Sequence, residues 1–148
     1  MEGCLRHSGS AGLLVRVGNS GNGKTSFVMQ LCKELCKYDR VAFNSLEEGT
    51  SLTVQNNLRR FGMAEVSRHL AFIKEDIPTL KIRLRRHKSF NIVIIDSFQY
   101  TQMTYRDYIQ LKEEFPDKLF VFISHARGKN PKGDAATSVM YDADLKIW

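Results

Sequence analysis

A glycine-rich segment near the amino terminus carries the clearest chemical signal in the sequence. Residues 18–25 fit the pattern G-x-x-x-x-G-K-S/T at every fixed position. Glycines allow the backbone N–H groups to approach phosphate oxygens, and the helix that follows adds the positive end of its dipole. We expect Lys24 to reach the β- and γ-phosphates of a purine nucleoside triphosphate, ATP with Mg²⁺, and Thr25 to bind the metal. The predicted nucleotide-binding residues are Gly18, Asn19, Ser20, Gly21, Asn22, Gly23, Lys24, Thr25 and Ser26.

A second acidic position follows the continuous apolar run at residues 92–95. Such a run is typical of a strand buried on both faces, and α/β sheets bind ligands at the carboxyl ends of such strands. We therefore expect Asp96 to bind Mg²⁺ together with Thr25, directly or through water. The alternative is that Asp96 caps the segment that follows it.

Two further apolar runs also end in polar residues. Glu47 and Glu48 follow the run at residues 41–46, where a carboxylate could orient or deprotonate an attacking water molecule. The candidate catalytic residues are therefore Glu47, Glu48 and Lys24, although the two acids could instead be solvated loop residues. Ser124 and His125 follow the run at residues 119–123 and could contact the γ-phosphate. A hydrogen bond from His125 into local structure is the alternative.

The elements that must position these residues alternate between strands and helices. Expected strands are at 13–17, 41–46, 70–73, 92–95, 119–123 and 145–148. Helical patterns lie at 24–37, after Thr50 or Ser51 up to Gly62, from Pro78 onward, and at 105–115. This alternation predicts an α/β fold with a mainly parallel sheet covered on both sides.

Composition limits the class of protein. The chain has 148 residues, enough for one domain, and 43% of them are hydrophobic, enough for a core. We expect one domain over 1–148 with a flexible segment at 1–12, no membrane span, and a cytoplasmic location. Cys32 and Cys36 share a helix face with Phe27, which predicts two buried thiols rather than a zinc site.

Basic residues give a net charge of +6, which is compatible with nucleic-acid binding without establishing it. The cluster at 81–88 is dense, and we interpret it as a solvated helix face in preference to a DNA contact. Arg127, Lys129 and Lys132 are better placed for single-stranded DNA, although their loop has no aromatic residue to stack on bases. Arg59 or Arg60 could lie against an adenine ring, with solvated surface as the alternative.

Taken together, these segments resemble the RecA-like ATPase superfamily. Residues 45–48 are similar to the strand-two signature of RadA, KaiC and DnaB-type members, and residues 94–97 to the Walker B strand of RecA and RadA. Residues 124–129 are similar to a Gly-His stretch of bacterial RadA that precedes a DNA-facing loop. The resemblance covers the chain from about residue 13 to residue 148.

The resemblance implies a three-layer fold with the strand order 3-2-4-5-1-6. It implies that Glu47 is the catalytic base with a contribution from Glu48, and that Ser124 and His125 sense the γ-phosphate. Residues 127–137, with Arg127, Lys129 and Lys132, become a mobile loop toward DNA, and assembly into a hexameric ring or filament is expected. A zinc-type cysteine cluster, a protease-like domain and the Lys-Asn-Arg-Phe-Gly motif are absent from the sequence, and relatives continue past the last strand to a cationic finger. These departures predict a minimal core, shortened at its carboxyl end.

Three functions are compatible with these residues. An ATPase that acts in DNA recombination, repair or helicase-type work accounts for most of them. A KaiC-like ATPase that signals through protein partners without DNA is the second. A small-molecule kinase is the third, and the acids at 47 and 48 argue against it, because a group that activates water would waste ATP.

Overall fold

A parallel β-sheet forms the centre of the part of the chain that the computed structural model describes, namely residues 12–17, 22–46, 52–96, 98–127, 130–131 and 145–147. The strands are β1 (Gly12–Val17), β2 (Val41–Ser45), β3 (Leu70–Ile73), β4 (Ile92–Asp96), β5 (Leu119–Arg127) and β7 (Leu145–Ile147). Their order is β3-β2-β4-β5-β1-β7, and every neighbouring pair is parallel. The short β6 (Asn130–Pro131) pairs antiparallel with β5. The expected order is confirmed, and its sixth strand is β7 because β6 intervenes in the numbering.

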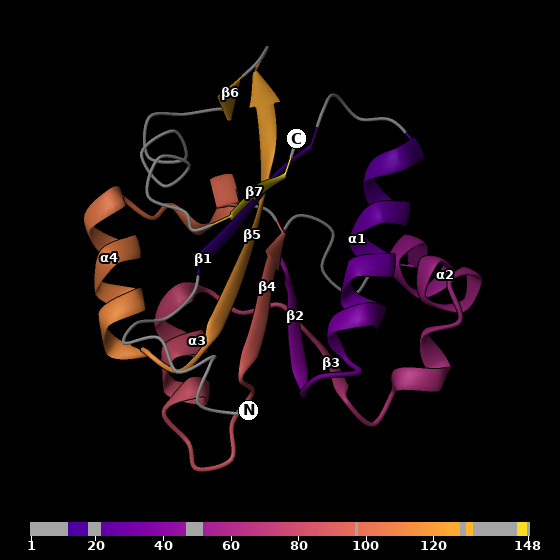
Figure 1. Cartoon of the computed structure of the whole chain (residues 1–148), viewed down its shortest axis with the longest axis horizontal. Coiled ribbons are helices and arrows are strands. Elements are labelled where there is room, and N and C mark those ends of the chain that lie inside the picture. Colours follow the sequence, from indigo (N-terminus) through magenta and orange to yellow (C-terminus); the bar gives the residue numbers. More distant parts are fainter. Residues whose placement is uncertain are drawn as a thin grey trace.

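Helices cover both faces of the sheet, so the architecture is the expected three-layer α/β fold (Figure 1). On one face lie α1 (Asn22–Leu35), α2 (Leu52–Arg60) and the 3₁₀ helix η2 (Met63–Val66). On the other face lie α3 (Ile77–Leu84) and α4 (Tyr105–Glu114), and a second 3₁₀ helix, η3 (Phe98–Thr101), follows β4. Within the described residues, none of the helices combines the length and the apolar character that crossing a bilayer requires.

Two apolar clusters join these layers. Leu80 of α3 and Leu111 of α4 pack in the same cluster as Ile95 on one face of β4. Val28 of α1 packs with Ile94 on the other face. Successive residues of β4 thus alternate between two cores, as expected for a strand that is buried on both sides. Burial of each large apolar side chain contributes about 1.5–3 kcal/mol, so the central strands are held firmly.

The two cysteines of α1 lie on its buried face, as predicted. Cys32 and Cys36 are 0% and 4% exposed, and both are free thiols. A hydrogen bond to Cys36, together with burial, raises the pKa of the Cys32 thiol well above its usual range. Phe27 was expected on the same face, but this was wrong, because its side chain is 39% exposed.

Local capping signals explain where several helices begin and end. The Asp76 carboxylate accepts a hydrogen bond from the Thr79 backbone N–H at 2.9 Å, at the start of α3. Thr104 and Asp107 form a capping box at the start of α4, in which each side chain accepts a bond from the other's backbone N–H. Gly62, with φ of 65°, follows α2 in the left-handed conformation that glycine adopts most readily.

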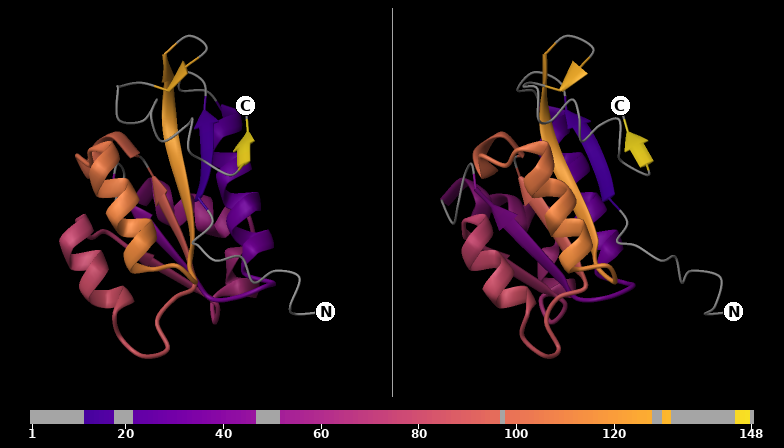
Figure 2. Two further views of the ribbon diagram at one scale, coloured as in Figure 1. Left: turned by 60° about the vertical axis from the view of Figure 1, so that its left-hand side comes forward. Right: turned by 90° about the vertical axis from the view of Figure 1, so that its left-hand side faces the viewer.

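Two expected boundaries differ from the observed ones. The first helix begins at Asn22 and ends at Leu35, earlier at both ends than the expected 24–37. The strand expected at 119–123 continues to Arg127, because it pairs with β1 as far as His125 and with β6 at Arg127. Figure 2 shows β5 extending beyond the end of β4. Pairing with neighbouring strands therefore extends a segment whose own sequence is polar.

The basic cluster of α3 contacts acidic side chains of the protein itself. The Arg83 Nε donates to both carboxylate oxygens of Glu75 at 3.0 Å, and this contact raises the pKa of Arg83. Lys81 and Arg85 both form ion pairs with Glu114 of α4. These pairs connect α3 to α4, which favours a structural role for the three basic residues over contact with DNA.

Candidate nucleotide-binding site

The carboxyl ends of four parallel strands meet at one edge of the sheet. Ser45 of β2 lies opposite Asp96 of β4, and Asp96 lies opposite Ile123 of β5. One position further along β5, Ser124 pairs with β1, and His125 pairs with Val17, the last residue of β1. The strand ends that the sequence marked as functional are therefore neighbours, at the edge where α/β sheets bind ligands.

The phosphate loop connects β1 to α1 at this edge. Its first residues, Gly18 to Gly21, lie outside the described residues, whereas Asn22 to Ser26 form the first turns of α1. The side chains of Lys24, Thr25 and Ser26 also lie outside what the structure describes. A strand, a short loop and a helix amino terminus follow each other here, and the helix end presents unpaired backbone N–H groups suited to an anion.

Asp96 ends β4 in a half-buried position beside β2. Its backbone oxygen accepts a hydrogen bond from the Leu46 N–H at 2.7 Å. Alternation along β4 places Asp96 on the same face as Ile94, which packs in the α1 cluster. The carboxylate therefore lies on the face of the sheet that α1 covers.

The residues at this edge fit Mg²⁺ better than a transition metal. Among the described residues, no group of three or more His, Cys, Asp or Glu side chains could hold a metal ion. Mg²⁺ is usually held by one or two protein oxygens and the substrate's phosphates, with water completing the shell. The Asp96 carboxylate and the Thr25 hydroxyl are the protein oxygens that would hold it.

Glu47 and Glu48 lie outside the described residues, but the strand that leads to them is fixed on both sides. Leu46 is bonded to Asp96 on the β4 side. On the β3 side, the buried Asn44 amide donates to the Glu75 carbonyl oxygen at 2.8 Å and accepts from the Glu75 N–H at 2.9 Å. The chain therefore leaves β2 next to Asp96, at the edge that carries the phosphate loop.

Ser124 lies on the other face of the sheet from α1. Its side chain is 0% exposed and alternates onto the same face of β5 as Phe122, within the cluster that includes α3 and α4. The Gln99 Nε2 atom of η3 donates a hydrogen bond to the Ser124 Oγ at 2.8 Å. His125 lies in β5, and its side chain lies outside what the structure describes. The predicted sensor residues are thus adjacent in the chain, and Ser124 contacts the segment that follows Asp96.

The predicted DNA residues begin in a strand rather than in a loop. Arg127 is the last residue of β5 and pairs with Asn130 of β6, so the expected loop at 127–137 starts as a two-stranded ribbon. Lys129 and Lys132 lie outside the described residues. A ribbon has its backbone N–H and C=O groups partly paired, so Arg127 is fixed to the sheet more firmly than a loop residue would be.

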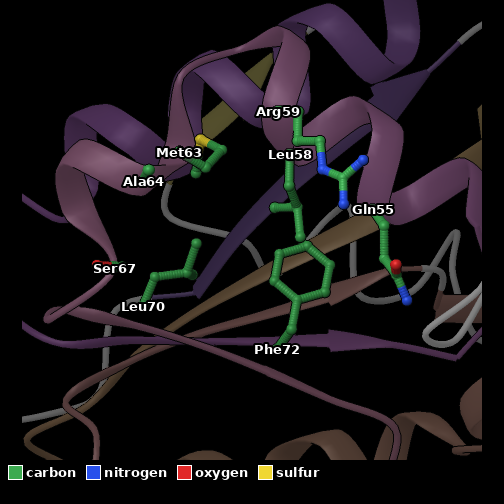
Figure 3. Close-up of a pocket in the computed structure, with 8 residues that line it drawn as sticks. All are labelled: Gln55, Leu58, Arg59, Met63, Ala64, Ser67, Leu70 and Phe72. Atoms are coloured by element: carbon green, nitrogen blue, oxygen red, sulfur yellow. The ribbon is translucent and has the colours of Figure 1, made fainter.

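A groove of about 380 Å³ lies elsewhere, between α2, η2 and the edge strand β3 (Figure 3). Leu58 of α2 lies over the Phe72 ring, and Arg59 and Gln55 lie at one end. Arg60 stacks over Phe61, with 5.4 Å between the guanidinium carbon and the ring centroid. The groove's lining residues include neither Asp96 nor Ser124. The contact of Arg59 or Arg60 with adenine stays a prediction.

Two residues near the site were not found from the sequence. Asn44 was read only as part of an apolar run, and Gln99 was not noticed at all. A polar residue within the run at 41–46 was a signal for Asn44, because a buried amide needs partners. Gln99 offered no comparable signal, since its partner is 25 residues away along the chain.

Comparison with known proteins agrees with this geometry at the level of the fold. No family model and no curated protein matches the sequence. A KaiC-like protein, PH0186 from Pyrococcus horikoshii OT3, aligns with a TM-score of 0.62 and 16% identity, covering 87% of this chain and 67% of that one. The ATPase domain of a helicase aligns with a TM-score of 0.62 and 17% identity, covering 92% of this chain and 68% of that one. Together with the strand order and the loop between β1 and α1, these likenesses show that the chain has the fold of the RecA-like P-loop ATPases.

Proposed function

We propose that the chain binds ATP with Mg²⁺ at the phosphate loop and hydrolyses it. The observation that carries the proposal is the joining of β1 to α1 through a segment that fits the phosphate-binding pattern at every fixed position. The fold it shares with PH0186 and with the helicase ATPase domain supports the same function.

Each site residue has a role in this proposal. The backbone of residues 18–23 surrounds the phosphates, and Lys24 compensates the charge that develops on the β- and γ-phosphates. Thr25 and Asp96 hold Mg²⁺, which when bound neutralises phosphate charge. Glu47, with Glu48 beside it, orients and deprotonates the attacking water. His125 and Ser124 report the presence of the γ-phosphate to the β5–β6 ribbon.

Work on DNA is the proposed use of the hydrolysis, through the β5–β6 ribbon with Arg127 and the lysines at 129 and 132. The pairing of Arg127 within β5, next to the predicted sensor, supports a link between nucleotide and ribbon. The second candidate is a KaiC-like ATPase that acts on protein partners, which the likeness to PH0186 favours. Assembly into a ring or filament belongs to the proposal for either function.

The proposal is tested by removing the lysine that contacts the phosphates. Lys24→Ala should weaken binding of a fluorescent ATP analogue by roughly tenfold to a hundredfold, because a charge-assisted hydrogen bond to phosphate is lost. Lys37→Ala is the matched control, since Lys37 is an exposed residue just beyond the opposite end of α1. Unchanged affinity in Lys24→Ala would contradict the assignment of the loop. Phosphate release without an added acceptor separates hydrolysis from a kinase reaction.

A further inference from the structure

The segment after Asp96 is attached to the neighbouring strand by two contacts. Gln99 donates from Nε2 to the Ser124 Oγ at 2.8 Å. One residue earlier, the Phe98 ring packs edge-to-face on Phe122, with 5.6 Å between centroids and an interplanar angle of 81°. Both contacts join η3 to β5, although η3 belongs in sequence to the end of β4.

The hydrogen bond lies in an otherwise apolar surface. Phe120 and Phe122 precede Ser124 on the same face of β5, and all three side chains are 0% exposed. An apolar side chain at 124 would bury more apolar area there, so the pair is not explained by the stability of the core alone. A buried polar pair of this kind fixes one arrangement of the elements that it joins.

The pair closes a short ring around Asp96. Asp96 lies opposite Ile123 in the parallel ladder, and Ser124 is the next residue of β5. The chain from Asp96 to Gln99 then returns to Ser124 through the side-chain hydrogen bond. Asp96 is therefore held to β5 by the ladder on one side of the ring and by Gln99 on the other.

We propose that Gln99 is a positioning residue that fixes the Asp96 carboxylate for Mg²⁺ by holding the end of β4 to Ser124. This inference rests on the proposed ATP and Mg²⁺ site. Metal ligands must be held within a fraction of an ångström, and residues that orient them affect metal affinity without contacting the ion. Gln99 acts on Asp96 through the backbone and not by contact with the nucleotide.

The fold does not depend on this one bond. The end of β4 is also held by β2, through the bond from the Leu46 N–H to the Asp96 oxygen at 2.7 Å. Loss of the Gln99 bond should therefore leave the sheet intact while giving the Asp96 side chain more freedom. The phosphate loop lies on different elements, so its own contribution to nucleotide affinity should remain.

The test compares affinity for a fluorescent ATP analogue in MgCl₂ and in EDTA. Gln99→Met keeps the length of the side chain but removes the hydrogen bond. We expect the Mg²⁺-dependent gain in affinity to fall by about tenfold, while the affinity in EDTA stays within about twofold of wild type. Gln110→Met is the matched control, because Gln110 is exposed on α4, and its Mg²⁺-dependent gain should equal that of wild type.

A double-variant cycle identifies the partner. Ser124→Ala should reproduce the loss of the Mg²⁺-dependent gain, and Gln99→Met should add nothing further in the Ser124→Ala background. An undiminished Mg²⁺-dependent gain in Gln99→Met would overturn the inference. So would an equal loss of affinity in MgCl₂ and in EDTA, which indicates a general structural role. Absence of nucleotide binding by the wild-type chain would instead overturn the proposed function, and the wild-type measurement shows this separately.

Discussion

Among single residues, Asn44 has the most demanding position. It is fully buried in β2, one of the strands that end at the candidate site. Its amide forms two hydrogen bonds to the backbone of Glu75, just beyond the end of β3, and so replaces a rung of the ladder between the two strands. Because both groups of Glu75 depend on one side chain, Asn44 holds together the β2 end that leads to Glu47.

Replacement of Asn44 should therefore affect stability strongly. Asn44→Leu leaves a backbone N–H and a carbonyl of Glu75 without their partner, which should lower the free energy of unfolding by about 2–4 kcal/mol. Urea denaturation measures this change. Asn56→Leu on the exposed side of α2 is the control and should change the free energy of unfolding by less than about 0.5 kcal/mol. Equal midpoints for the two variants would show that Asn44 is not required.

At the scale of elements, helix starts are set by short local interactions. The capping box of Thr104 and Asp107 begins α4, whose buried Tyr108 and Leu111 pack against the central strands. The Thr104 backbone N–H and hydroxyl lower the pKa of the Asp107 carboxyl below its ordinary value of 3.8. A carboxyl with a lowered pKa in the folded state stabilises the fold above its unfolded-state pKa.

The capping box predicts a pH dependence of stability. Asp107→Ala should lower the Tm at pH 7, and its difference from wild type should shrink as the pH falls below 3.8, because protonation removes the same interaction from the wild type. Thermal denaturation followed by circular dichroism from pH 7 to pH 3 measures this. Glu113→Ala removes an exposed carboxylate from the last turn of α4, outside the capping box, and should not lower the Tm at pH 7. A difference for Asp107→Ala that persists at pH 3 would contradict this account.

Elements with strong local patterns were predictable from the sequence, and long-range pairings were not. Pro78 in the first turn and apolar residues at 77, 80 and 84 were sufficient for α3. The end of β5 was not predictable, because residues 124–127 are mostly polar and become a strand only through pairing with β1 and β6. The bond between Gln99 and Ser124 depends on the turn geometry of η3, which no periodicity encodes. The phosphate-binding pattern, by contrast, was readable at once because all its residues are consecutive.

At the scale of the whole molecule, the charge balance is positive by six, with 22 basic and 16 acidic residues. Part of this charge is neutralised within the structure, since Lys81, Arg83 and Arg85 pair with Glu75 and Glu114. The candidate DNA residues at the β5–β6 ribbon are thus separate from the basic cluster of α3. The two surfaces can be distinguished by substitution.

The proposed DNA role predicts salt-dependent binding of a single-stranded oligonucleotide that increases with a bound ATP analogue. Lys129→Ala and Lys132→Ala should each lower the slope of log affinity against log salt by about 1, because each removes one phosphate contact. Arg86→Ala, on the exposed side of the α3 cluster, is the control and should leave the slope unchanged. Fluorescence anisotropy measures the binding. No binding with or without nucleotide would favour the KaiC-like function, and a lower slope only in Arg86→Ala would place the DNA on α3.

The position of β1 in the sheet has a consequence for the order in which the protein can be assembled during translation. Residue 13 of β1 pairs with residue 121 of β5 and residue 145 of β7, so the first strand to be synthesised has its partners in the last third of the chain. At about 5–20 residues per second, β1 waits on the order of five to twenty seconds for its first partner strand. The phosphate loop is therefore translated early but can be supported only late. ATP binding by a nascent chain would report the completion of the sheet and not the synthesis of the loop itself.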